Sequence, residues 1–126
     1  MTDSSCEHQT FMVPIFSVTD MEKAFEFYTS VLGMEKRWEW GEPVDYACVA
    51  TEDAELFLCL NGQGAPGAWM YLFVADVAAW YQRIRDQGWE DVSEMLDEPW
   101  GMREFMVKDP DGNVLRIGTS LERLDD

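Results

Sequence analysis

The stretch from Glu98 to Ile117 carries the side chains with the clearest capacity for ligand chemistry. Trp100 lies on a loop between a proline and a glycine, where an exposed indole ring can stack on a flat ligand. Arg103 and Arg116 follow on two predicted strands, and their guanidinium groups suit a structural ion pair or an acidic group of a ligand. Stacking and ion pairing are therefore the chemistry that this stretch favours.

A β-hairpin is expected to position these side chains. The run 103–107 is rich in β-forming residues, the sequence Asp-Pro-Asp-Gly-Asn at 109–113 favours a tight turn, and 114–117 returns as the second strand. With Lys108 opposite Asn113, alternation along the strands places five residues on one face: Arg103, Phe105, Val107, Val114 and Arg116. That face has apolar and cationic groups but no metal ligand.

Acid–base and nucleophilic catalysis have few candidate residues. The only histidine, His8, lies with Cys6 in a polar N-terminal segment that is predicted to be a loose tail. Cys48 and Cys59 are predicted to be small hydrophobic residues on buried strands, and no histidine neighbours them to form a nucleophilic dyad. An odd number of cysteines argues against a disulfide framework and suits a reducing compartment.

Composition narrows the classes of partner. The chain has 126 residues, 47% of them hydrophobic, which is enough for one compact domain with its own core. Its formal net charge of −16 repels nucleic acid and anionic lipid and attracts cations. No stretch resembles a signal peptide or a membrane span, so a soluble cytoplasmic protein is expected.

Two predicted helices carry the same pattern. Asp20 caps the first and Gly33 ends it, while Asp76 caps the second and Gly88 ends it. Apolar residues follow the two caps at identical offsets, namely Met21, Ala24, Phe25 and Tyr28 in the first helix and Val77, Trp80, Tyr81 and Ile84 in the second. Trp80, like Trp89 after the helix, is therefore expected in the core.

Strands surround each helix in the same order. A strand precedes each helix (11–18, weakened toward an edge by Pro14, and 70–74), and a short strand follows it (35–40 and 91–95). Each half then ends in a hairpin. In the first hairpin, strands 46–50 and 55–60 flank a four-residue turn, and this register places four residues on one face: Tyr46, Cys48, Phe57 and Cys59.

The chain is therefore predicted to be an α+β protein made of two βαβββ modules. The modules span 11–60 and 68–118, the segment 61–67 links them, and tails occupy 1–10 and 119–126. Two curved mixed sheets would enclose a concave surface, and the helices would cover the outside.

The duplication and two motifs resemble the vicinal oxygen chelate superfamily, also called the glyoxalase/bleomycin resistance/dioxygenase superfamily. The motifs are Asp-x-x-x-Ala-x-x-Phe-Tyr-x-x-x-Leu-Gly at 20–33 and Asp-Pro-Asp-Gly-Asn at 109–113, and the resemblance covers residues 11–118. The superfamily includes metal-dependent isomerases, dioxygenases and thiol transferases as well as metal-free drug-binding proteins. Membership alone therefore does not fix the function.

The resemblance implies four cleft-facing positions that hold a metal ion in the metal-dependent members. They fall on Val13, Phe57, Trp69 and Arg116, none of which can hold a divalent cation. Neither a metal nor another cofactor is therefore expected. An alternative stays open, in which a lyase or dioxygenase uses a metal held by unconventional acidic ligands.

Within the superfamily, the chain is most similar to bleomycin resistance proteins. The segment 99–105 resembles their Pro-Trp-Gly-Arg-Glu-Phe sequence with Met102 inserted, and Val13-Pro14 resembles their start. Trp69 resembles the tryptophan of their cleft, while Trp38 and Tyr46 fall where that family places phenylalanines.

This resemblance implies a homodimer that exchanges N-terminal strands and sequesters a cationic, planar-ringed antibiotic in two interface clefts without altering it. The predicted ligand-binding residues are Trp38, Tyr46, Phe57, Trp69, Trp100, Arg103 and Arg116. Four acidic residues around Trp38 (Glu35, Glu39, Glu42 and Asp45) form either a solvated face or an attractor for a positive ligand tail. A metal-free carrier of another small aromatic ligand is a further alternative.

Overall fold

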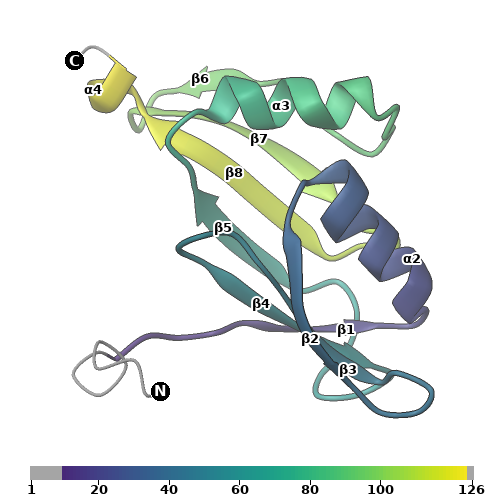
Figure 1. Cartoon of the computed structure of the whole chain (residues 1–126). Coiled ribbons are helices and arrows are strands. Elements are labelled where there is room, and N and C mark those ends of the chain that lie inside the picture. The colour runs from purple at the N-terminus through teal and green to yellow at the C-terminus, as the bar shows by residue number, and fades with distance from the viewer. Residues whose placement is uncertain (1–9, 125–126) are drawn as a thin grey trace.

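Each half of the chain folds into one βαβββ module (Figure 1). The structure is a computed structural model and describes residues 10–124, so all but the last residue of the predicted tail at 1–10, including Cys6 and His8, lies outside the described residues, as do 125–126. Each module contributes one four-stranded mixed sheet, with strand orders β1-β4-β3-β2 and β5-β8-β7-β6. The predicted α+β fold with two modules is confirmed.

The first module comprises β1 (Ile15–Val18), α2 (Met21–Phe25), η1 (Glu26–Val31), β2 (Glu35–Trp40), β3 (Tyr46–Ala50) and β4 (Glu55–Leu60). The second comprises β5 (Trp69–Phe73), α3 (Val77–Asp86), β6 (Leu96–Glu98), β7 (Met102–Lys108) and β8 (Val114–Ser120), followed by α4 (Leu121–Leu124). In both sheets the strand before the helix pairs in parallel with the last strand, and the other pairs are antiparallel. No helix in the described part of the chain has both the length and the apolar character needed to cross a bilayer.

The predicted helix signals are confirmed. The Asp20 carboxylate accepts a hydrogen bond from the Lys23 amide at 3.1 Å, and the Asp76 carboxylate accepts one from the Ala79 amide at the same distance. The first helix changes from α to π geometry at Glu26. It ends at Gly33, whose φ of 81° is the left-handed conformation that glycine adopts most readily.

One face of each sheet packs against the helices and forms a single core. Buried residues from both modules meet there, including Phe16, Tyr28, Leu58, Ile84, Phe105, Leu115 and Ile117. In the described part of the chain no helix covers the opposite face of either sheet, and several large side chains on it are exposed. The uncovered faces are therefore the surfaces on which ligands or partners can bind.

Two predicted strands are placed wrongly. Residues 11–14 are not part of β1; Pro14 has no amide hydrogen for a ladder, although its carbonyl accepts from the Phe57 amide at 3.0 Å. The run 91–95 makes only an isolated bridge between Val92 and Val107, and the strand β6 begins later. The Ser93 hydroxyl accepts a hydrogen bond from the Met106 amide at 2.8 Å, so a regular β-ladder cannot continue there.

The register predicted for the second hairpin is wrong by one residue. Lys108 pairs with Val114 because the turn is closed by Asp109 and Asn113, whose amide and carbonyl are joined at 2.9 Å. Residues 103, 105 and 107 therefore point to the helix side, and Arg116 points to the uncovered face. The four-residue turn of the first hairpin is confirmed, with Ala50 opposite Glu55.

Candidate functional site

The uncovered face of the first sheet carries a cluster of aromatic rings. Trp38, Tyr46 and Phe57 contact one another edge to face, with ring centroids 5.1 to 5.7 Å apart. The register brings them together, since Cys48 is paired with both Trp38 and Phe57. We call these three rings with the neighbouring Trp40 the first aromatic face.

Mutual contact fixes the first aromatic face without burying it. Edge-to-face pairs stabilise each ring orientation by about 0.5–1.5 kcal/mol. Trp38 nevertheless keeps 38% of its surface exposed and Trp40 keeps 73%. A flat ligand would therefore meet rings that are already oriented, which reduces the entropy lost on binding.

A thiol and a carboxylate lie on the same face. Cys48 is buried, and its Sγ lies 3.5 Å from Glu55 Oε1. Burial, followed by the hydrogen bond to Glu55, raises the pKa of the Cys48 thiol to about 11. The thiol is therefore protonated at neutral pH and is not a nucleophile.

The uncovered face of the second sheet has a different organisation. Trp69, Tyr71 and Phe73 alternate along the edge strand β5, and Trp100 lies on the loop between β6 and β7. Trp69, Phe73 and Trp100 each keep 60% or more of their surface exposed. We call these four rings the second aromatic face.

A buried carboxylate organises the middle of the second aromatic face. Glu104 on β7 is 4% exposed and accepts a hydrogen bond from the Tyr71 hydroxyl at 2.6 Å and another from Arg116 Nη2 at 2.5 Å. The arginine supplies the opposite charge that a buried carboxylate requires. Burial and the bond to Glu104 raise the pKa of Tyr71, so its hydroxyl stays a donor at neutral pH.

A glycine makes this arrangement possible. Gly118 on β8 is the register partner of both Phe73 and Glu104, and the Tyr71 side chain crosses directly over it to reach the carboxylate. A Cβ atom at Gly118 would collide with the Tyr71 hydroxyl oxygen and would lie 2.9 Å from Glu104 Cβ. Because Gly118 has no side chain, the Tyr71 side chain has room to pass over β8 and reach Glu104.

Arg116 also contacts an aromatic ring. Its Cζ atom lies 5.6 Å from the centroid of the Trp100 ring, within the range of a cation–π interaction. The Glu104 ion pair and the Trp100 ring thus hold the guanidinium from two sides.

Arg103 does not join this site. The corrected register places it opposite Thr119, on the other face from Arg116. It forms an exposed ion pair with Asp97 at 2.6 Å, and the hydrogen bond from Arg103 lowers the pKa of that carboxyl. The predicted shared face of Arg103 and Arg116 is therefore wrong, while an ion pair for each is what the structure contains.

The side chains at the four positions that the resemblance assigns to metal ligands do not fit a divalent cation. Val13, Phe57 and Trp69 offer no acceptor atom, and Arg116 is itself a cation. Within residues 10–124, no three carboxylate, thiol or imidazole groups gather closely enough to hold a metal ion.

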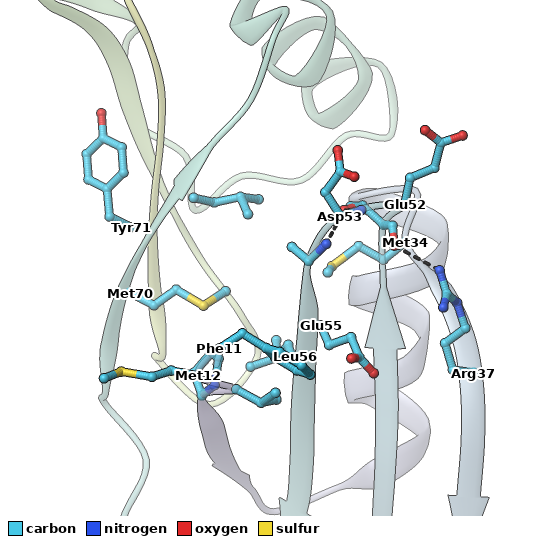
Figure 2. A pocket seen from close by; sticks show the side chains of 15 residues that line it. Phe11, Met12, Met34, Arg37, Glu52, Asp53, Glu55, Leu56, Met70 and Tyr71 are labelled. Atoms are coloured by element: carbon cyan, nitrogen blue, oxygen red, sulfur yellow. Dashed lines mark hydrogen bonds between the residues drawn. The ribbon is translucent and has the colours of Figure 1, made fainter. Parts of the chain in front are cut away.

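A sizeable pocket lies apart from most of these rings. It measures about 460 Å³ and lies between the segment 11–14, the turn 51–54 and β5. In Figure 2, the apolar side chains of Phe11, Met12 and Met70 lie low in the pocket, whereas the carboxylates of Glu52 and Asp53 lie high. Among its lining residues, Tyr71 belongs to the second aromatic face, and Glu55 contacts Cys48 on the uncovered face of the first sheet.

Four residues of the aromatic faces were missed at the level of sequence. Trp40, Tyr71, Phe73 and Glu104 were not predicted to bind ligand, although three of them follow a readable signal. Trp40 is two residues beyond Trp38, and Tyr71 and Phe73 are two and four residues beyond Trp69. Side chains at such even spacings lie on the same face of a strand. Glu104 could be found only with the correct register of the second hairpin.

Comparisons with known proteins agree with this fold. Residues 10–117 match the family model described as the Glyoxalase/Bleomycin resistance protein/Dioxygenase superfamily. No curated protein sequence matches the chain significantly.

Several solved structures are similar over nearly their whole length. TnmS3, an antibiotic binding protein from Streptomyces sp. CB03234, is 31% identical, with 88% of this chain and 97% of that chain covered and a TM-score of 0.70. TioX from Micromonospora sp. ML1 is 21% identical, with coverages of 90% and 100% and a TM-score of 0.80. A bleomycin-binding protein complexed with bleomycin is 18% identical, with coverages of 89% and 99% and a TM-score of 0.76.

Proposed function

Because the chain belongs to the glyoxalase/bleomycin resistance protein/dioxygenase superfamily, we propose that it is a metal-free protein that sequesters an antibiotic with flat aromatic rings and a positive charge, of the bleomycin type. The observation that carries this proposal is the pair of uncovered aromatic faces at positions where metal-dependent members hold an ion. Rings at Phe57 and Trp69 offer stacking in place of coordination. The ligand is retained and released unaltered.

Electrostatics supports a cationic ligand. The net charge of −16 raises the local concentration of cations around the whole molecule. The exposed carboxylate of Glu42 lies just beyond β2, the strand that carries Trp38 and Trp40, whereas Glu39 points to the other face of the sheet and pairs with Lys36. A positive tail of the ligand would meet the Glu42 carboxylate while its rings stack on the first aromatic face.

We propose that the binding unit is a homodimer. Three large rings of the second aromatic face are at least 60% exposed in a single chain, which is unusual for a surface that stays in water. Two copies that bring the first aromatic face of one toward the second aromatic face of the other would form two enclosed clefts. Exchange of the segment preceding β1 is a compatible way to join them.

The nearest alternative is a metal-free carrier of another aromatic antibiotic. TnmS3 is an antibiotic binding protein that is 31% identical to this chain, so the class of ligand is supported more strongly than bleomycin itself. A metalloenzyme would need ligands other than the side chains at the four usual positions. Elemental analysis of protein prepared without chelator separates these functions, because an enzyme of that kind would contain stoichiometric metal.

Calorimetric titration with metal-free bleomycin tests the proposal. We expect a dissociation constant in the micromolar range or below, two drug molecules per dimer, and intact drug after release. Replacing Trp38 or Trp100 with alanine should weaken binding about 10-fold, since one good stacking or cation–π contact contributes roughly 1–2 kcal/mol. Trp80→Phe in α3 is the matched control and should bind like the unmodified protein. If no binding is detected at drug concentrations 100-fold above the micromolar range, bleomycin is ruled out as the ligand.

A further inference from the structure

Beside the second aromatic face lies a hydrogen-bond donor that no other described residue uses. We infer that the ligand carries an uncharged carbonyl or amide oxygen on the edge of its ring system, and that Arg116 donates a hydrogen bond to this oxygen. The inference rests on the proposed function and specifies the chemistry of its ligand.

Arg116 has more hydrogen-bond donors than the described residues accept from. A guanidinium group has five N–H bonds, and within the described residues this one makes a single hydrogen bond, from Nη2 to Glu104. Nε is buried without a partner. Among the residues that the structure describes, Nη1 has no partner either; it is not one of the buried unpaired atoms, and 35% of the Arg116 side chain is exposed, so Nη1 is open to solvent. Nη1 is therefore the edge that a ligand can reach.

The surroundings of Arg116 are shaped for the edge of a ring system. Tyr71 is its register partner on β5, and Trp69 lies two residues before Tyr71 on the same face. On the other side, Arg116 lines a pocket of about 230 Å³ between β6, β7 and β8, together with Leu96 and Met106. A ring lying on the β5 aromatics would extend its edge over the guanidinium and toward this pocket.

Charge selects a neutral acceptor over an anion. Glu104 already balances the charge of Arg116 through a close ion pair. Glu94 and Glu98 also line the pocket and would repel an anionic group. A carbonyl or amide oxygen accepts the hydrogen bond without meeting this repulsion.

Glu104 and Tyr71 act as positioning residues in this arrangement. The carboxylate fixes the guanidinium through Nη2, and the Tyr71 hydroxyl occupies the second carboxylate oxygen, so Glu104 cannot turn away. Trp100 restrains the guanidinium from another side. The free donor is thus held in place before the ligand arrives, which lowers the cost of binding.

A matched pair of probes tests the inference. The 2-aminomethyl derivatives of fluorenone and fluorene share a flat three-ring frame and a positive charge, and only fluorenone has a carbonyl oxygen. In calorimetric titrations of the full chain we expect fluorenone to bind about 10-fold more tightly, as one hydrogen bond to a charged donor allows. We expect the ratio to fall to about 1 in the double variant Glu104→Gln, Arg116→Met, which removes both charges together. Arg103→Met, the arginine of the opposite face, is the control and should leave the ratio unchanged.

Arg116→Lys provides a second variant, because lysine can keep the ion pair with Glu104 but lacks the planar second donor edge. It should reduce the ratio to about 2 while the melting temperature stays near that of the unmodified protein. Equal affinity of the unmodified protein for both probes, or a 10-fold ratio that survives in these variants, would overturn the inference while the proposed function stands. Failure of both probes and of bleomycin to bind would instead remove the proposed function, and the inference with it.

Discussion

The two modules share one chain path but differ at the junction between a helix and the hairpin turn of the other module. The first helix lies against the turn 109–113, where the Tyr28 hydroxyl donates to the buried Asp109 carboxylate at 2.7 Å. At the other junction, α3 lies beside the turn 51–54, and a pocket of about 270 Å³ separates Trp80 from the turn. One junction is closed by polar contacts, and the other is left open.

The difference arises from residues at equivalent offsets. Tyr28 lies eight residues after its capping aspartate, and Ile84 lies eight residues after the other, so only the first helix presents a hydroxyl at this place. The turn facing Tyr28 is rich in polar partners. The Asn113 side chain donates to the Ser17 carbonyl and to Asp109, and its oxygen accepts from the amides of Gly67 and Ala68. The turn 109–113 therefore joins both modules and the linker, while within residues 10–124 the hydrogen bonds of the turn 51–54 stay inside the first module, including one from Arg37 on β2 to the Thr51 carbonyl.

Asp109→Ala is expected to have the largest effect on this comparison. The carboxylate accepts four hydrogen bonds, from Tyr28, from the amides of Asp111 and Asn113, and from the Asn113 side chain. Its removal leaves buried donors without partners, and we expect a loss of about 4 kcal/mol in the free energy of unfolding. Chemical denaturation measures this value.

Asp53→Ala in the turn 51–54 is the matched control. Asp53 is exposed, and within the described residues its contacts in the turn are made by its amide rather than by its carboxylate. The change should cost less than about 0.5 kcal/mol. Similar losses in the two variants would show that the junctions do not differ in the way the hydrogen bonds indicate.

Gly118→Ala is expected to have the next largest effect, and it tests the difference between the two aromatic faces. The new methyl group would collide with the Tyr71 hydroxyl and break its bond to Glu104. We expect a loss of about 2 kcal/mol in unfolding free energy, the cost of overpacking, together with weaker ligand binding. The first aromatic face, whose rings hold one another, should keep its arrangement.

Tyr71→Phe in the Gly118→Ala background sharpens this test. Removing the hydroxyl relieves the collision, so the double variant should be more stable than the sum of the single changes predicts. A double-mutant cycle by chemical denaturation gives the coupling. Strictly additive losses would contradict the collision as the cause.

Sequence patterns were sufficient for the two-module architecture but not for the ends of two strands or for the second aromatic face. The capping aspartates, the repeated apolar offsets and the first hairpin could be read directly, because each depends on local spacing. The register of the second hairpin depends on whether the turn closes at Lys108 or at Asp109, which is decided by hydrogen bonds to the Asp109 side chain. Because of this one-residue difference, Arg103 was assigned to the wrong face and Glu104 was not placed on the face of Arg116.

The smallest expected effect is a dependence of the unfolding free energy on pH, which Tyr28 of the first helix should cause and Ile84 at the equivalent offset of the second cannot. Burial, followed by the charge of Asp109, raises the pKa of Tyr28 above its ordinary value of 10.0, so the unfolded chain loses this proton first as the pH rises. The stability that protonated Tyr28 contributes is complete below pH 10 and is lost progressively above it. By pH 11 the loss should be about 1.4 kcal/mol, because one pH unit beyond the unfolded pKa corresponds to roughly that free energy. Tyr28→Phe removes the titrating group, as isoleucine already does in the second helix. The difference in unfolding free energy between the unmodified protein and Tyr28→Phe should therefore shrink between pH 9 and 11, whereas a constant difference would mean that the hydroxyl does not need its proton at this junction.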